Sequence, residues 1–165
     1  MLKFIKQVFL YYNMKKQLRN KDIRGLKDFI KEDTLKNANK IEKLEDNNGS
    51  FILIEEEPVL FEYENKWVYT LKAIIKQINI NNYKEVIVDK GAIRFVTGGA
   101  DIMRPGITKI NIAIKEKEIV LIKEETHNKP LAIGCSLFSG EEMQNMDSGK
   151  VIKNLHYVSD AIWNK

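Results

Sequence analysis

The asparagine-rich run from Asn79 to Asn82 divides this 165-residue chain into two halves with different hydropathy patterns. Before it, helix-like and strand-like segments alternate; after it, short strand-like segments follow one another with close turns. A polar stretch without apolar periodicity is a typical domain boundary. Because units of roughly this size can still bury a core, we predict an α+β protein with two small domains, 14–82 and 83–165. Residues 1–13 show neither helical periodicity nor turn signals, and we interpret them as an extension that precedes a start at Met14.

The first half is predicted to be a small α/β unit. A helix is expected to begin at Asn20, a favourable N-cap residue, with one apolar face made of Ile23, Leu26, Phe29 and Ile30. Three strands are expected at 51–54, 58–63 and 66–69, with Glu64-Asn65 as the hairpin turn between the last two. A second helix is expected after its cap Thr70, with an apolar stripe at Leu71, Ile74, Ile75 and Ile78.

The second half is predicted to be a mostly antiparallel barrel of short strands. Strands are expected at 85–88, 118–123, 129–139 and 150–158, and the third alternates in the way that gives a strand two distinct faces. The turn Thr126-His127-Asn128 precedes that third strand. The spacing of Ser139 and Glu142 predicts a capping box at the start of a short helix.

The net charge of +4 is spread unevenly over the first half. Segment 14–31 has seven bases and two acids, whereas segment 32–66 has four bases and ten acids. A basic segment beside an acidic one favours a binding face over uniform solubilising charge. The basic candidates for contact with RNA are Lys15, Lys16, Arg19, Lys21 and Arg24.

A glycine-bordered loop in the second half suits contact with phosphate. A helical turn at 92–96 is followed by Gly98-Gly99, where positive φ is easily adopted, and Pro105-Gly106 makes a second turn. Between the two turns the backbone can approach a partner closely. Backbone N–H groups and cations both favour an anion, and the loop is surrounded by Lys90, Arg94, Arg104 and Lys109.

Segments 88–107, 134–143 and 156–163 together resemble the PUA half of the malignant-T-cell-amplified-sequence family and its archaeal relatives. The resemblance implies a C-terminal PUA mixed β-barrel after a small N-terminal α/β domain. It also implies binding to the small ribosomal subunit and to tRNA-related RNA in initiation, reinitiation or recycling, with a second translation factor as a possible partner. The implied RNA-binding residues are Lys90, Arg94, Gly98, Gly99, Ala100, Arg104 and Lys109. From the last strand, His156 is interpreted mainly as a packing residue, and Tyr157 is a weaker candidate.

Several function classes are disfavoured by the sequence. A single cysteine, Cys135, permits no internal disulfide and suits a cytoplasmic protein, and two distant histidines make no credible metal site. The longest apolar run near the start, 8–12, is too short for a signal peptide, and no run approaches the length of a membrane span. A nucleophile pair of Cys135 and His127 is disfavoured because Cys135 is expected to be buried. We therefore expect a non-enzymatic protein without cofactors.

Two alternatives to a translation factor remain open. The acidic strands of the first half could dock a basic protein, which would make the chain chiefly an assembly subunit. The chain could also be an accessory specificity subunit of an RNA-modification complex. Four aromatic residues of the first-half strands are expected to pack in the core and not to stack on bases: Phe61, Tyr63, Trp67 and Tyr69. Glutamates lie between them in the sequence and would repel phosphate. Trp163 is expected to anchor the chain end.

Overall fold

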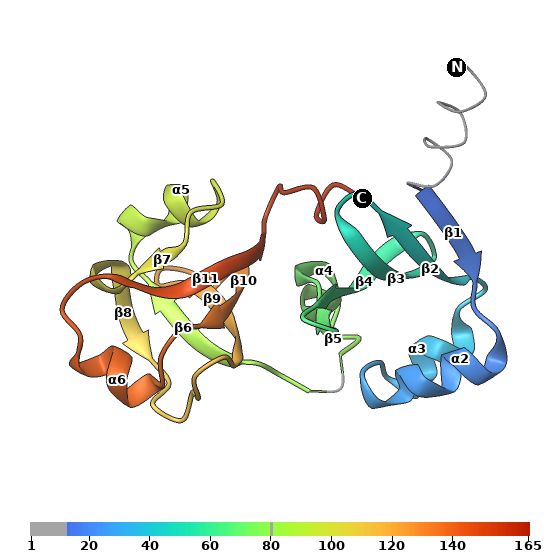
Figure 1. Cartoon of the computed structure of the whole chain (residues 1–165), viewed down its shortest axis with the longest axis horizontal. Coiled ribbons are helices and arrows are strands. Elements are labelled where there is room, and N and C mark those ends of the chain that lie inside the picture. Colours follow the sequence, from blue (N-terminus) through green and yellow to red (C-terminus); the bar gives the residue numbers. More distant parts are fainter. Residues whose placement is uncertain (1–12, 80) are drawn as a thin grey trace, which may run out of the picture. The chain divides into compact units, whose positions relative to one another are not determined.

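The structure is a computed structural model that describes residues 13–79 and 81–165, and it divides into two compact units between Asn81 and Asn82 (Figure 1). This division falls inside the asparagine-rich run. Residues 1–12 of the expected extension lie outside the described residues. Among the described residues, no helix has the length and apolar character needed to cross a membrane.

The first unit is built on a five-stranded antiparallel sheet in the order β1-β2-β3-β4-β5. The strands are β1 (Asn13–Gln17), β2 (Ile41–Asp46), β3 (Gly49–Ile54), β4 (Glu57–Tyr63) and β5 (Lys66–Tyr69). The three strands expected from the sequence are confirmed, and both residues of the Glu64-Asn65 turn have positive φ. The sequence does not predict β2 because its buried Ile41 and Leu44 are three residues apart and do not follow the period of two.

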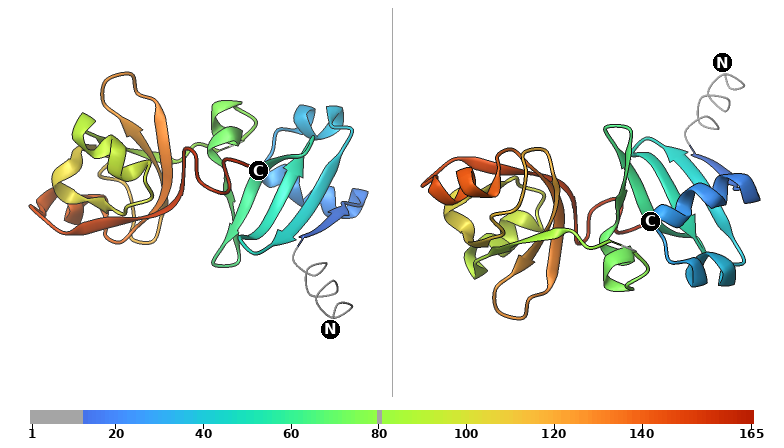
Figure 2. Two further views of the ribbon diagram at one scale, coloured as in Figure 1. Left: turned by 90° about the horizontal axis from the view of Figure 1, so that it is seen from above. Right: turned by 90° about the horizontal axis from the view of Figure 1, so that it is seen from below.

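The first expected helix is shorter than predicted and is broken. Arg19 rather than Asn20 is the N-cap residue of α2 (Asn20–Arg24), and a 3-10 helix, η1 (Gly25–Asp28), follows directly. Glycine is a poor helix former, so the presence of Gly25 explains why the α-helix ends and a 3-10 helix begins at this residue. The tighter turn leaves Leu26 and Ile30 buried. The sequence also misses α3 (Glu32–Asn37), which lies with α2 on one side of the sheet (Figure 2).

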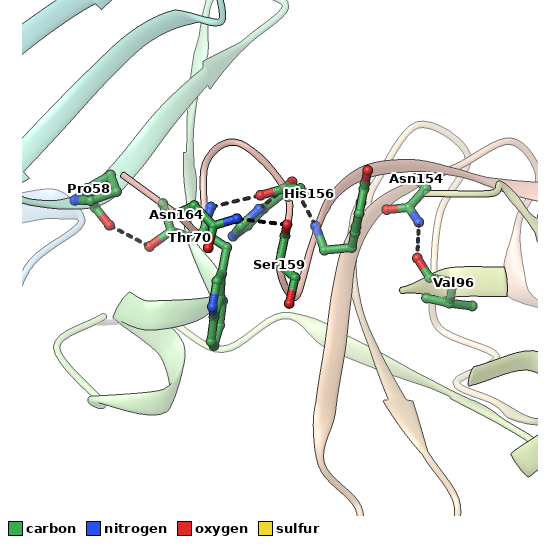
Figure 3. Close-up of polar contacts among 10 residues, drawn as sticks. Pro58, Thr70, Val96, Asn154, His156, Ser159 and Asn164 are labelled. Atoms are coloured by element: carbon green, nitrogen blue, oxygen red, sulfur yellow. Dashed lines mark hydrogen bonds and ion pairs between the residues drawn. The ribbon is translucent and has the colours of Figure 1, made fainter. Parts of the chain in front are cut away.

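The helix cap at Thr70 is confirmed. The Thr70 hydroxyl accepts a hydrogen bond from the Ala73 N–H at 3.2 Å and donates one to the Pro58 carbonyl at 2.8 Å (Figure 3). The helix that follows, α4 (Leu71–Ile75), is only five residues long. Ile75 is 50% exposed, so its predicted place on the buried stripe is wrong; Gln77, at φ 55°, turns the chain away two residues later.

The second unit is a curled six-stranded sheet in the order β7-β11-β10-β9-β6-β8. Its strands are β6 (Lys84–Val88), β7 (Ile102–Met103), β8 (Ile107–Ile110), β9 (Ile119–Glu124), β10 (Pro130–Ser136) and β11 (Lys150–Tyr157). All neighbours are antiparallel except β6 and β9, which run parallel. The expected mixed barrel is confirmed, and β7 and β8 are additions that the sequence does not predict.

Short helical segments connect these strands. They are η2 (Lys90–Ala92), α5 (Ile93–Val96), η3 (Arg104–Gly106) and α6 (Gly140–Asn145). The capping box is confirmed, because the Ser139 hydroxyl accepts from the Glu142 N–H while the Glu142 carboxylate accepts from the Ser139 N–H. Strand β10 does not have one buried and one exposed face: every residue from Leu131 to Ser136 is buried. The curled sheet and the segments that pack on it therefore cover both sides of β10.

Candidate nucleic-acid interface

The glycine-bordered loop lies between α5 and β7, where the sequence predicts it. Asp89 caps the start of η2, since its carboxylate accepts the Ala92 N–H at 2.8 Å. At the other end of the helical turn, Gly99 has φ +88°. A Cβ atom at Gly99 would lie only 2.8 Å from the Tyr157 hydroxyl oxygen. Both the backbone angle and this close approach require glycine.

A pocket of about 540 Å³ opens beside this loop and is lined mainly by apolar groups. Its lining residues are Asp89, Gly91, Ala92, Phe95, Val96, Ala100, Asp101, Ile102, Met103, Pro105 and Gly106. Phe95 is 54% exposed and Met103 is 50% exposed, although most large apolar side chains of this unit are buried. Exposed apolar groups at the wall of an apolar pocket make it a candidate binding site.

Two predicted cations flank this pocket and are exposed. Lys90 immediately precedes the lining residue Gly91. The Arg94 guanidinium lies over the ring of Phe95, with its Cζ atom 4.5 Å from the ring centroid. Arginine stacked on an exposed aromatic ring presents a flat cationic surface, which suits both a base and a phosphate.

Arg104, the third cation that the sequence places at this loop, hydrogen-bonds to the protein itself. Its Nε–H donates to the Met143 carbonyl at 2.6 Å, and its NH1 group donates to the Ile107 carbonyl at 3.1 Å. Arg104 is partly buried and joins η3 to α6. Its guanidinium satisfies two backbone carbonyls, so we expect the replacement of Arg104 to reduce stability.

Lys109 lines a different hollow. This second hollow has a volume of about 660 Å³ and is more polar, and Lys109 shares it with Asn82, Tyr83, Lys84, Glu85, Ile87, Asn111, Glu125 and Asn128. Of the predicted loop residues, Ala100 therefore lines the apolar pocket, Arg94 stacks on its lining residue Phe95, and Lys90, Gly98 and Gly99 are close in sequence to lining residues without lining the pocket themselves, whereas Lys109 lies in another hollow on the same unit. The predicted basic residues of the first unit lie on neighbouring segments of the chain: Lys15 and Lys16 on β1, where consecutive side chains point to opposite faces, Arg19 at the N-cap, and Lys21 and Arg24 on α2. All five are exposed, and Arg19 forms an ion pair with Asp22 at 3.2 Å.

Sequence reasoning misses three side chains of the pocket region. Phe95 is not singled out by the sequence; α5 has only four residues and buries Val96, which leaves Phe95 exposed. Met103 follows buried Ile102 in a two-residue strand and points outward, as alternation requires. Lys150 on β11 forms an ion pair with Asp101 at 3.1 Å. Burial raises the pKa of the Asp101 carboxyl, but the Asn154 N–H and Lys150 lower it more, so Asp101 is ionised.

The last strand does not offer His156 to a ligand. His156 is fully buried, and its Nδ1 atom lies 2.8 Å from an Asp160 carboxylate oxygen (Figure 3). The same carboxyl group of Asp160 accepts the N–H groups of Tyr157 and Trp163. His156 is thus a packing residue, as expected. Cys135 is buried and His127 is exposed on the β9–β10 turn, an arrangement that does not suit a nucleophile pair.

Comparisons with known proteins match both halves of the chain. The PUA domain model matches residues 84–158, and a domain of unknown function, DUF1947, matches residues 15–77. Translation machinery-associated protein 20 of Saccharomyces cerevisiae is 32% identical over 117 residues, which cover 67% of this chain and 64% of the yeast protein. Malignant T-cell-amplified sequence 1 of Danio rerio is 37% identical over 79 residues, or 46% of this chain and 44% of that one.

An uncharacterized protein of Methanocaldococcus jannaschii is 46% identical over 113 residues, which cover 68% of both chains. The chain belongs to the malignant T-cell-amplified sequence family of PUA proteins. A solved structure of a hypothetical protein from Pyrococcus horikoshii shares the fold of this PUA protein, with a TM-score of 0.70 at 27% identity, and covers 92% of this chain and 98% of its own. The chain spans less than two thirds of the length of its yeast relative.

Proposed function

We propose that this PUA protein binds structured RNA, either ribosomal RNA or tRNA, and acts with the translation machinery at the small ribosomal subunit during initiation or recycling. Support comes from the PUA domain and from a relative whose name is translation machinery-associated protein 20. The basic residues on β1 and α2 offer a second RNA contact on the first unit.

The observation that carries the proposal is the apolar pocket with Lys90 and Arg94 beside it. An unpaired base has two apolar faces and suits the wall formed by Phe95 and Met103, whereas its phosphates suit the two cations. The carboxylates of Asp89 and Asp101 in the lining already accept backbone N–H groups of the protein. They would repel a phosphate from the pocket, so the base enters and the phosphate stays at the rim.

We further propose that the protein works by binding and not by catalysis. Within residues 13–79 and 81–165, no group of three or more histidine, cysteine or acidic side chains could hold a metal ion. The single thiol, Cys135, is buried, where a cysteine is unreactive.

Co-sedimentation of the tagged protein with purified small ribosomal subunits tests the proposal, with a structured tRNA as the second ligand. The variant Arg94→Glu removes the stacked cation, and Lys129→Glu is the matched control, because Lys129 is exposed and does not line the pocket. We expect Arg94→Glu to abolish co-sedimentation and Lys129→Glu to retain it. Two phosphate contacts predict roughly a sevenfold loss of affinity for a fourfold increase in salt.

The other outcomes separate the alternatives. If the protein binds tRNA but not the subunit, an accessory role in an RNA-modification complex becomes the better hypothesis. If it binds neither RNA and instead captures a basic protein through the acidic strands, the chain is an assembly subunit. If Arg94→Glu and Lys129→Glu reduce co-sedimentation equally, Arg94 has no particular role in binding.

A further inference from the structure

Strand β11 contains a β-bulge where it pairs with β10. Gly134 pairs with Asn154, but its neighbour Ile133 pairs with His156, so Leu155 is an extra residue on β11. Side chains alternate along a regular strand, and residues three apart therefore point to opposite faces. A bulge adds one residue and re-aims the side chains beyond it. Asn154 and Tyr157 consequently both reach the loop 97–101.

Asn154 makes three hydrogen bonds with the segment that contains this loop. Its side-chain NH₂ group donates to the Val96 carbonyl at 3.0 Å and to the Ala100 carbonyl at 3.0 Å (Figure 3 shows the first). Its backbone N–H donates to the Asp101 carboxylate at 2.9 Å. One side chain thus joins the end of α5 to the far side of the Gly98-Gly99 turn.

Tyr157 completes the support from the same strand. The Tyr157 ring lies so close to Gly99 that a Cβ atom there would come within 2.9 Å of ring carbons. The backbone hydrogen bonds that the loop donates are local ones that end α5, from Thr97 to Ile93, from Gly98 to Arg94 and Phe95, from Gly99 to Val96, and from Ala100 to Phe95. The Asp101 carboxylate also forms an ion pair with Lys150 of β11. The Asn154 side chain therefore ties both sides of the turn, at Val96 and Ala100, to the barrel, whereas Lys150 reaches only Asp101 after the turn.

We propose that Asn154 is a positioning residue for RNA binding, which holds the Gly98-Gly99 turn in the conformation that the ligand requires. The inference rests on the proposed function of the pocket, whose lining includes Ala100 and Asp101. Asn154 acts through the loop. Removal of its side-chain NH₂ group therefore lowers the population of the binding-competent loop conformation without removing a phosphate contact.

The test compares Asn154→Asp and Asn154→Ala with the control Asn145→Asp. Asn145 is an exposed residue at the end of α6, so its variant makes the same change in charge on the same unit away from the loop. Amide hydrogen exchange is measured on the full chain without ligand, and affinity for tRNA is measured over a series of salt concentrations. The variant Arg94→Gln serves as the reference for a lost phosphate contact.

For both Asn154 variants we expect faster exchange of the amides at 98–101 and an affinity lower on the order of tenfold, the loss that two missing hydrogen bonds can produce. The dependence of log affinity on log salt should keep its slope, whereas Arg94→Gln should make it shallower by about 0.7. Asn145→Asp should change neither the exchange nor the slope.

Three results would overturn the inference: unchanged exchange at 98–101, unchanged affinity when the wild-type protein binds, or an affinity loss accompanied by a shallower slope. The last would mean that the substitution removes a contact between a cation and a phosphate, which the proposal excludes. If the wild-type protein binds no tRNA, the proposed function fails for that ligand, while hydrogen exchange still shows whether Asn154 holds the turn. Asn154→Asp preserves the side-chain shape and keeps the test available if Asn154→Ala does not fold.

Discussion

Replacement of Gly99 by alanine should strongly destabilise the PUA unit. Alanine at φ +88° is strained by about 1–2 kcal/mol, because the left-handed region brings Cβ close to the backbone. The added methyl group also meets the Tyr157 ring at less than 3 Å, and overpacking of this kind typically adds about 1–3 kcal/mol. The expected decrease in the free energy of unfolding is therefore about 2–5 kcal/mol.

Native-state hydrogen exchange of the buried β10 amides measures this loss in the PUA unit alone, since core amides exchange through global opening of their unit. The steric part is isolated in a Tyr157→Ala background, where Gly99→Ala should lose only the backbone part, about 1–2 kcal/mol. Gly149→Ala is the control in the same unit: Gly149 has φ +94°, but the nearest atom to an added Cβ is Met146 Cε at 3.9 Å, so only the backbone part of the loss is expected.

A loss below about 0.5 kcal/mol for Gly99→Ala in the wild-type background would refute this reasoning, because it is the size of an ordinary surface substitution. An equal loss with and without Tyr157 would refute only the steric part. Either result would mean that the loop can move away from β11 at little free-energy cost.

Three further predictions concern other residues. Arg104→Met should destabilise the PUA unit by about 1–3 kcal/mol in the same exchange assay, because two carbonyls lose a charged donor. Glu64→Asn with Asn65→Gly should raise the melting temperature, because asparagine and glycine tolerate the positive φ of this two-residue turn far better than glutamate. Burial raises the pKa of the Asp160 carboxyl, but the His156 and backbone hydrogen bonds lower it more, so this pKa lies below its ordinary value. The ionised carboxylate therefore contributes its full stabilisation above the ordinary Asp pKa, and this contribution is lost as pH falls through the lowered pKa. In Asp160→Asn, the free energy of unfolding should consequently decrease less between neutral and acid pH, which unfolding experiments at a series of pH values would measure.

The elements that sequence reasoning finds are those whose signal is local. The Thr70 cap and the Glu64-Asn65 turn depend on residues close in sequence, and the structure has both. Strand β2 is missed because side chains on both of its faces are buried, so its sequence lacks the alternation of apolar and polar residues that predicts a strand. The helix after Arg19 is overestimated because an apolar stripe satisfies a 3-10 turn as well as an α-helix over so few residues.

The candidate site follows the same division. The glycine loop and its helical turn are evident from sequence, since their glycines and proline have local meanings. What Arg104 and Asn154 contact is not evident, because Met143 lies 39 positions from Arg104 and Val96 lies 58 positions from Asn154. Lys109 is close to the loop in sequence, yet β8 carries it along the sheet into another hollow.

The order of the strands has a consequence for synthesis on the ribosome. The sheet of the first unit joins strands in chain order, so each hairpin can form soon after its residues leave the exit tunnel. The second sheet cannot close in this way, because β6 pairs with distant β9 and β7 pairs with the last strand, β11. That last strand also supplies Asn154 and Tyr157. In the nascent PUA unit, the loop proposed to bind RNA is therefore fixed only after β11, the last strand of this sheet, has been translated.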